Sequence, residues 1–279
     1  MKKLYIDIGG THLRSELHSG SSVVCEQVAS QDQELLAYID RKMSEHPDIG
    51  FIGIAYAGQV DSGMILSSPN IAFSEAAIKK SVESRYGVTL AIDNDLNCAA
   101  MAEAAHWRSR SIALLYVGTG IGAAMVDDGK IVRGSRNLAY EIGHIPYRDA
   151  PFLCGCGRRN CVELFASGSG MAKWLHHFGI DRSPDLHRFR DSKVAHERTV
   201  AGQFEEALLH AAGTLVTLAN PSLLILGGGV IRKNPYLLAL LEKELGAFAL
   251  KPSLETLRIE MSALENAPMA GARLLEAYG

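Results

Sequence analysis

The stretch Leu4–Thr11 reads LYIDIGGT, and its plan returns at Leu114–Gly120, which reads LLYVGTG. Each stretch starts as an apolar run typical of a buried strand and breaks at glycine beside a threonine. The residues after each glycine turn continue as a second strand, so each stretch predicts a β-hairpin. One hairpin plan used twice in 279 residues indicates a duplicated α/β fold. We therefore expect an N-terminal domain of residues 1–109 and a C-terminal domain of residues 110–267, with a last helix at about 268–279 that packs back on the first.

Between and after the two hairpins, short apolar runs alternate with stretches of helical spacing, as in α/β proteins. Further strands are expected at Gly50–Ala57, Val88–Ile92, Leu223–Leu226 and Leu257–Met261. Helices are expected at Asp32–Ser44, Ser74–Gly87 with Ser74 as N-cap, Asp95–Trp107, Val162–Phe178, Val200–Ala219 and Pro235–Leu245. An Asp128-Gly129 pair predicts a tight turn after the second hairpin's return strand.

The composition excludes several classes of protein. With 47% apolar and 21% charged residues, the chain is an average globular sequence rather than a disordered or coiled-coil one. A net charge of -3 gives no basic face for nucleic acid, so no nucleic-acid partner is expected. The most apolar run, Leu223–Ile231, is too short to span a membrane, and Asp7 interrupts any signal-like start. Five cysteines without a signal sequence favour a reducing, cytoplasmic setting.

The two glycine turns are candidate phosphate sites. In Gly9-Gly10-Thr11 and Gly118-Thr119-Gly120, glycine lets the backbone approach an oxyanion, and threonine adds a hydroxyl donor. Either turn alone is more often an ordinary hairpin turn, but the pair, at the same place in each half, favours a polyphosphate. The stretch Gly118–Ala123 also matches a dinucleotide fingerprint, which we discount because a strand follows it where a helix is needed.

Three aspartates lie at strand ends or just past them: Asp7, Asp93 and Asp95. Carboxylates there suit Mg²⁺ or the deprotonation of a substrate hydroxyl. Asp95 is the better candidate base because it follows Asn94 at a strand-to-helix transition. From these residues alone, a simple N-cap role for Asp95 is at least as well supported.

The sharpest chemical signal is a set of four candidate metal ligands within eighteen residues, namely His144, Cys154, Cys156 and Cys161. Three thiolates and an imidazole with glycines between them match a structural zinc site. An iron–sulfur cluster fits the spacing poorly, and three unrelated free cysteines are the remaining alternative. A closed four-ligand site supplies no activated water, so we interpret the zinc as structural.

Two glutamates are tied to this cysteine cluster by sequence. Glu141 lies three residues before His144, and Glu163 lies two residues after Cys161. A metal there would fix both carboxylates, and fixed carboxylates accept paired hydroxyls well. The sequence therefore suggests a polyol or sugar ligand, although each glutamate alone would be a common surface charge.

Together these motifs resemble the ROK family (repressor, open reading frame, kinase), whose catalytic members are bacterial sugar kinases of the actin-like ATPase fold. The resemblance runs from residue 4 to the C-terminus, with Gly227–Val230 (GGGV) as a further marker. The motifs that carry it are Asp7–Thr11 (DIGGT), Asn94–Ala100 (NDLNCAA), Gly118–Gly122 (GTGIG), Glu141–His144 (EIGH) and Cys154–Gly168 (CGCGRRNCVELFASG).

The resemblance implies two ribonuclease-H-like domains flanking an active-site cleft, in a homodimer. It implies that Asp95 takes the proton from a sugar hydroxyl, commonly at C6, and that Asp7 serves Mg²⁺. The sugar would be held by Asn70, Asn94, Asp95, Glu141, His144 and Glu163, with His144 also binding zinc. ATP would be held by Gly9, Gly10, Thr11, Gly118, Thr119, Gly120, Gly227 and Gly228.

Two departures from the family pattern matter. The stretch Ala55–Asp61 (AYAGQVD) lacks a proline that members often carry there, so the loop on the sugar side differs. The phosphate motif begins at residue 7, whereas repressor members carry an N-terminal helix-turn-helix. We predict an ATP- and Mg²⁺-dependent hexokinase-type enzyme with structural zinc and glucose as first substrate. N-acetylmannosamine, N-acetylglucosamine, allose and fructose stay open, and a non-catalytic sugar-binding regulator is the rival.

Overall fold

The computed structural model describes residues 1–68 and 71–277, which divide into two compact units. The first unit comprises Met1–Arg108, Ile131–Ala139 and Leu264–Gly279, and the second comprises Ser109–Lys130 and Tyr140–Ala263. The chain therefore leaves the first unit, returns to it briefly after residue 130, and returns again near its end.

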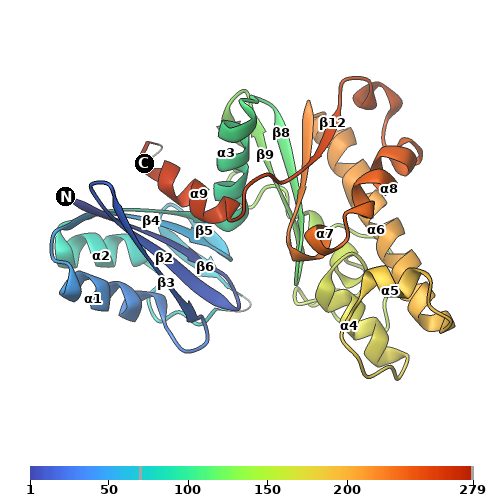
Figure 1. Ribbon diagram of the computed structural model, residues 1–279, viewed down its shortest axis with the longest axis horizontal. Coiled ribbons are helices and arrows are strands. Elements are labelled where there is room, and N and C mark those ends of the chain that lie inside the picture. The colour runs from blue at the N-terminus through green and yellow to red at the C-terminus, as the bar shows by residue number, and fades with distance from the viewer. Residues whose placement is uncertain (69–70, 278–279) are drawn as a thin grey trace. The chain divides into compact units, whose positions relative to one another are not determined.

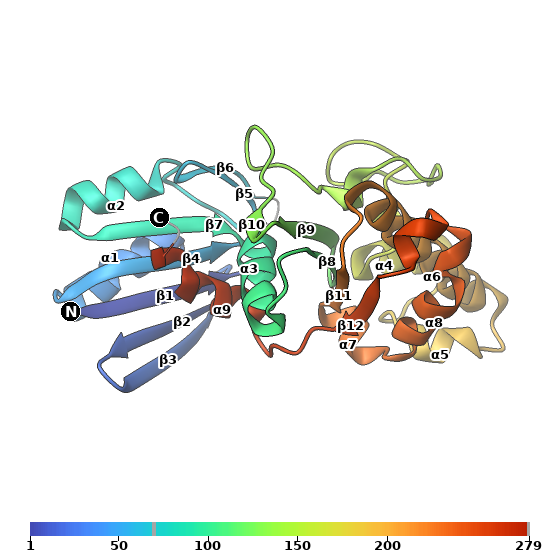
Figure 2. The same ribbon diagram turned by 90° about the horizontal axis from the view of Figure 1, so that it is seen from above.

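The first unit is built on a five-stranded sheet in the order β3-β2-β1-β4-β7 (Figure 2). Strands β1 and β2 form the expected hairpin, and β1, β4 and β7 run parallel. The pairing aligns Asp7 with Ala55 and Ala55 with Asp93, so both aspartates lie at the carboxyl ends of parallel strands. The strands are β1 (Lys2–Ile8), β2 (His12–Ser19), β3 (Ser22–Ala29), β4 (Ile49–Tyr56) and β7 (Thr89–Asn94), and a separate hairpin is formed by β5 (Gln59–Asp61) and β6 (Met64–Ser67).

Helices cover both faces of this sheet (Figure 1). Because side chains alternate along β1, Leu4 and Ile6 pack towards α1 (Leu35–Glu45) and α2 (Ile78–Tyr86). Tyr5 on the opposite face packs towards α3 (Asp95–Trp107) and α9 (Ala267–Leu274), which leads into η5 (Leu275–Ala277). Helix α9 crosses α3 closely at Gly271, where an added Cβ would lie 1.9 Å from the Cys98 carbonyl oxygen.

The second unit repeats the plan with a sheet in the order β10-β9-β8-β11-β12. Strands β8 and β9 form the second hairpin, and β8, β11 and β12 run parallel. The Asp128-Gly129 turn has positive φ at both residues (47° and 76°), as a tight two-residue hairpin turn requires. The strands are β8 (Ile112–Val117), β9 (Ile121–Asp127), β10 (Lys130–Ile131), β11 (Leu223–Gly227) and β12 (Arg258–Met261).

The helices of the second unit include a long one, α6 (Ala195–Ala219), which contacts β8, while α8 (Tyr236–Glu244) contacts β12. The others are α4 (Gly168–His177), α5 (Leu186–Arg190) and α7 (Gly229–Lys233), with short 3-10 turns η1 (Ile142–His144), η2 (Val162–Leu164), η3 (Leu245–Ala247) and η4 (Lys251–Leu254). The α/β class predicted from the sequence is confirmed, with open sheets that match the actin-like ATPase fold.

Several predicted helices have different limits: α1 begins at Leu35 rather than Asp32, and α6 begins at Ala195 rather than Val200. Two further differences have a clear local cause. Helix α2 begins at Ile78 rather than after Ser74, because the Glu75 carboxylate accepts the Ala77 N–H (2.8 Å) and holds a non-helical turn there. The helix expected at 162–178 is two elements, η2 and α4. The break falls at Ser167, whose side chain accepts the Gly170 N–H (2.9 Å) and caps α4.

Candidate active site and metal centre

The first glycine turn joins β1 to β2 and is held from behind by one serine. The Gly9 N–H donates to the His12 carbonyl (3.0 Å), which closes the hairpin. Buried Ser30, at the end of β3, donates its hydroxyl to the Gly9 carbonyl (2.6 Å) and its N–H to the Thr11 carbonyl (3.1 Å). Gly10 and Thr11 are exposed. The Gly9 and Thr11 carbonyls therefore accept hydrogen bonds from within the unit, and the turn is accessible on its outer side at Gly10 and Thr11.

Asp7 lies just before this turn and is buried, with 6% of its surface exposed. One carboxylate oxygen accepts from the Asn266 side chain (2.9 Å) and lies 3.5 Å from the Arg14 guanidinium. Burial raises the pKa of Asp7, and the bonds from Asn266 and Arg14 oppose that rise. Mg²⁺ prefers oxygen ligands and keeps several waters, so a single carboxylate beside the predicted phosphate turn fits a hydrated magnesium ion.

Asp95 is the first residue of α3, and Asn94 is the residue that caps this helix. The Asn94 Oδ1 accepts the N–H groups of Leu96 (2.9 Å) and Asn97 (3.2 Å). Asn94 is therefore the N-cap and Asp95 is not, although Asp95 Oδ1 also accepts the Leu96 N–H (3.0 Å). Asp95 is half-buried and lies at the positive end of the helix dipole.

The amide of Asn94 also donates to the Gly58 carbonyl (3.0 Å), which lies in the stretch that departs from the family pattern. The same amide nitrogen has a second hydrogen that a sugar oxygen can accept. The contact between Asn94 and the sugar stays a prediction. Asn70, another predicted sugar ligand, lies outside the described residues.

The second glycine turn, between β8 and β9, is held by the start of a helix. The Gly118 carbonyl accepts the Gly168 N–H (2.9 Å), and the Thr119 carbonyl accepts the Ser169 N–H (3.0 Å). A Cβ on Gly168 would lie 2.8 Å from the Gly118 carbonyl oxygen, so this close approach requires glycine. The first turn of α4 thus braces the second glycine turn directly.

Gly227, the last residue of β11, and Gly228, directly after it, lie against the same end of β8. Gly227 is paired in register with Tyr116, and a Cβ there would meet the Tyr116 ring. Gly228 has a φ of 88°, and its Cβ position is 2.4 Å from the Val117 carbonyl oxygen. The predicted nucleotide residues of the second unit therefore gather at one end of its sheet.

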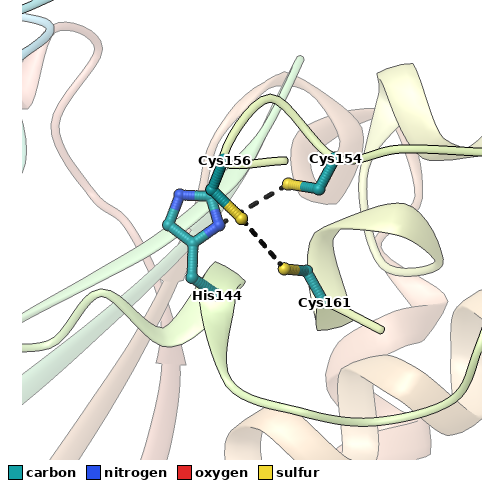
Figure 3. A group of neighbouring side chains, drawn as sticks. All are labelled: His144, Cys154, Cys156 and Cys161. Atoms are coloured by element: carbon teal, nitrogen blue, oxygen red, sulfur yellow. Dashed lines mark hydrogen bonds between the residues drawn. The ribbon is translucent and has the colours of Figure 1, made fainter. Parts of the chain in front are cut away.

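The four predicted metal ligands converge in the second unit (Figure 3). Their ligand atoms all lie within 4.8 Å of one another, with Cys154 Sγ 3.6 Å from His144 Nδ1 and Cys156 Sγ 3.3 Å from Cys161 Sγ. Four ligands of one tetrahedral zinc ion lie roughly 3.3–3.8 Å apart. The donor set and its spacing fit a closed structural zinc site, whereas unrelated cysteines would not converge with a histidine.

The backbone of the cysteine loop shapes this centre. The Gly157 N–H donates to the Cys154 carbonyl (2.9 Å), with Gly157 at a φ of 85°. The Arg158 guanidinium donates to the His144 carbonyl (2.6 Å). Although partial burial opposes it, the backbone and side chain of Arg158 lower the pKa of Cys156 to about 6. A thiol that loses its proton easily is suited to bind a metal ion.

Glu163 connects the metal centre with the second glycine turn. One carboxylate oxygen accepts from Cys154 Sγ (3.4 Å), and the other lies 2.7 Å from the position of a Cβ on Gly120. Desolvation raises the pKa of Glu141, while His144 opposes this rise and the charge of Glu163 adds to it. The charges of Glu163 and of the candidate ligand His144 therefore both act on the Glu141 carboxylate.

The partners of these site residues include side chains that the sequence did not single out. Ser30 supports the first glycine turn, and Asn266 supports Asp7. Asn266 precedes a proline two residues on, and its Oδ1 accepts the Met269 N–H (3.0 Å), so a helix-cap signal was present in the sequence. Arg133 and Asn137, which contact Asp93, carried no local signal.

Among the residues the structure describes, no helix is both long enough and apolar enough to cross a membrane.

Two five-stranded sheets of the same order, each with a glycine turn after its first strand, define the actin-like ATPase fold class. The family model described as "ROK family" matches residues 4–277, and the chain belongs to that family.

Named relatives span nearly the same length. The chain is 26% identical to a glucokinase of Halalkalibacterium halodurans, over 94% of this chain and 90% of that protein. It is 30% identical to an N-acetyl-D-glucosamine kinase of Erwinia tasmaniensis, over 80% of this chain and 82% of that protein. A ROK family glucokinase from Streptomyces griseus, solved with glucose and AMPPNP, superposes with a TM-score of 0.78 at 23% identity over 99% of this chain and all of that one.

Proposed function

We propose that this ROK protein is an ATP- and Mg²⁺-dependent sugar kinase that phosphorylates a hexose hydroxyl, commonly at C6, with Asp95 as the base. Its family and its named kinase relatives support the kinase class. One structural observation carries the assignment of the base. Asn94 caps α3, so the half-buried Asp95 carboxylate, whose Oδ1 accepts the Leu96 N–H (3.0 Å), is not the N-cap of this helix.

The reaction is an in-line phosphoryl transfer. The sugar hydroxyl gives its proton to Asp95, and its oxygen forms the new bond to the γ-phosphorus. The bond from that phosphorus to the bridging oxygen breaks, and ADP leaves. Bound Mg²⁺ supplies neutralisation of phosphate charge, and Asp7 would hold it. The turns at Gly9–Thr11 and Gly118–Gly120 would orient the phosphates, because positioning supplies most of the catalysis in this chemistry.

The metal centre would serve the sugar side of the reaction. Zinc there would be structural, held by His144, Cys154, Cys156 and Cys161. It would fix Glu141 and Glu163, which accept sugar hydroxyls together with His144. A thiolate-rich centre of this kind fits a reducing, cytoplasmic setting. The homodimer implied by the family resemblance stays a prediction.

The preferred sugar is glucose, with N-acetylglucosamine next, because both are substrates named for relatives of similar identity. N-acetylmannosamine, allose and fructose follow. The rival, a sugar-binding regulator without turnover, would keep Glu141 and Glu163 but would not need Asp95 as a base.

The test is a coupled ADP-release assay over a panel of these sugars. We expect turnover with at least one sugar and a loss of roughly 10²–10⁴-fold in kcat for Asp95→Asn, because a missing general base costs about that much. Sugar affinity, measured by calorimetry, should be little changed. Asp32→Asn, an exposed aspartate of the same unit, is the matched control. Sugar binding without any turnover by the wild type would favour the regulator.

A further inference from the structure

The carboxylate of Asp93, two residues before the proposed base, is buried and fully engaged. Only 3% of its surface is exposed. One oxygen accepts the Asn94 N–H (2.7 Å) and the side-chain amides of Asn97 (3.0 Å) and Asn137 (2.9 Å). The other oxygen pairs with the Arg133 guanidinium. Two of these partners come from the segment Ile131–Ala139, about 40 residues further along the chain.

Asn137 connects the members of this cluster to one another. Its amide nitrogen donates to the Val60 carbonyl (2.7 Å) as well as to Asp93. Its oxygen accepts from Asn97 (2.9 Å) and from Arg133 (3.2 Å). Its backbone has a φ of 56°, in the left-handed region that asparagine tolerates better than most residues. Asp93, Arg133, Asn137 and Asn97 therefore form one closed hydrogen-bonded group, which we call the Asp93 cluster.

The Asp93 cluster is more than the helix start requires. Asn94 already satisfies the first N–H groups of α3, so no further carboxylate is needed as a cap. Only the carboxylate of the Asp93–Arg133 pair is buried, since the Arg133 side chain is 40% exposed, and a pair of this kind is weak evidence for stability. What the Asp93 cluster does provide is a fixed backbone directly before Asp95, because the Asn94 N–H is held by Asp93 and the Asn94 side chain is held by α3 and Gly58.

We propose that Asp93, Arg133 and Asn137 are positioning residues that set the place of the Asp95 carboxylate for proton removal from the sugar. This proposal rests on the function proposed above for Asp95. Where catalysis depends on orientation, a misplacement of about 1 Å can cost roughly 100-fold in rate. A rigid support for the base can therefore raise kcat without a matching gain in stability. None of the three residues needs to touch the sugar or ATP.

The test compares four variants in the ADP-release assay with the best sugar. Asp93→Asn keeps the size of the side chain and removes its charge. Arg133→Met removes the paired charge, and Arg133→Lys restores it without the planar donors. Asn137→Gly keeps the left-handed backbone but removes the four side-chain bonds of Asn137. Arg136→Met, which removes an exposed arginine of the same segment, is the matched control.

We expect Asp93→Asn and Arg133→Met to lower kcat roughly 10- to 100-fold while KM for sugar and for ATP changes little. Arg133→Lys should recover part of the loss. The kcat of the double variant Asp93→Asn/Arg133→Met should be no lower than that of the weaker single variant. Each substitution removes the same ion pair, so their effects should not add. Arg136→Met should match the wild type.

Several outcomes would overturn the proposal. A folded Asp93→Asn enzyme with normal kcat and a lowered unfolding midpoint would show a structural role alone. A raised KM for ATP in Arg133→Met at normal kcat would make Arg133 a phosphate ligand instead. If Asp93→Asn does not fold, normal kcat in both Asn137→Gly and Arg133→Met decides against the proposal. A wild type that turns over no sugar would instead remove the proposed function, and the inference with it.

Discussion

The two glycine turns occupy the same place in two sheets of the same strand order, yet different structures support them. In the first unit, Ser30 at the end of an outer strand holds the carbonyls of Gly9 and Thr11. In the second unit, the first amides of α4 hold the carbonyls of Gly118 and Thr119. Helix α4 follows closely after Cys161 and Glu163, and its N-cap Ser167 donates its hydroxyl to the Glu163 carbonyl (2.7 Å), so the second turn is supported next to the candidate metal ligands. Both turns therefore have carbonyls that accept hydrogen bonds from the protein, but the groups that donate these bonds differ between the two units.

Removal of the metal should have the largest effect and should affect the turns unequally. Cys161→Ser replaces a fully buried thiol ligand, and loss of one ligand of a structural zinc site removes folding free energy. We expect loss of bound zinc, at least roughly tenfold lower turnover, and faster hydrogen exchange at residues 118–120 than at residues 9–11.

Metal analysis and peptide-resolved hydrogen exchange measure these effects. Cys25→Ser, an exposed cysteine outside the metal centre, serves as control and should behave like the wild type. Equal loosening of both turns would contradict the difference in support.

A methyl group placed between α4 and the second turn should destabilise the protein. In Gly168→Ala the new Cβ would lie 2.8 Å from the Gly118 carbonyl oxygen, and backbone atoms on both sides must move. Overpacking of this kind costs about 1–3 kcal/mol in the free energy of unfolding. Urea denaturation measures it. Gly202→Ala is the control, since that exposed position in α6 has open space and alanine there should be neutral or slightly stabilising.

Substitution of glycine by alanine on the outer side should have the same effect in both turns, because both positions have open space. A Cβ on Gly9 comes no closer than 3.9 Å to any neighbour, and one on Gly118 meets nothing within 4 Å. We expect Gly9→Ala and Gly118→Ala to keep the stability of the wild type while each raises KM for ATP several-fold. The added methyl groups would stand where the phosphates approach. A normal KM in one of the two variants would assign the polyphosphate to the other turn alone.

The smallest expected effect concerns the strand that carries Ser30. Although partial burial opposes it, hydrogen bonds from Lys42, Arg41 and Tyr38 lower the pKa of Glu26 on β3 to about 2. A lowered pKa means that this carboxylate stabilises the fold above pH about 4.5 and loses that contribution as the pH falls towards 2.

Glu26→Gln should therefore reduce the dependence of the unfolding free energy on pH in that window. Since the ion pairs are partly solvent-exposed, the change in the free energy of unfolding should be below about 1 kcal/mol. An unchanged pH dependence between the variant and the wild type would show that α1 does not hold β3 through this carboxylate.

Features decided by nearby residues were predictable from the sequence. Helix α3 has the predicted limits, Asp95–Trp107, because its start signal is adjacent to its alanine-rich body. The convergence of the four zinc ligands follows from their close spacing and the glycines between them. The helical turns α5 and α7 were not predicted, because segments of five residues are helical only through their packing, as the buried Leu186 and Phe189 show for α5.

Features decided across the chain were not predictable from one sequence. The Asp93 cluster depends on Arg133 and Asn137, which no periodicity relates to Asp93. The support of the first turn by Ser30 and of the second by Gly168 and Ser169 likewise depends on tertiary contacts. The sequence could indicate which groups do chemistry, but not which groups hold them in place.

The return of α9 to the first unit has a consequence for the growing chain. Helix α9 covers Tyr5 and Phe51 on the sheet and Cys98 on α3, but it is made after the whole second unit. At roughly 5–20 residues per second, ribosomes take roughly ten to thirty seconds to travel from Arg108 to Leu264. During that interval an apolar face of the first sheet lies uncovered. Newly made chains are therefore expected to need chaperone protection at that face until Gly271 reaches Cys98.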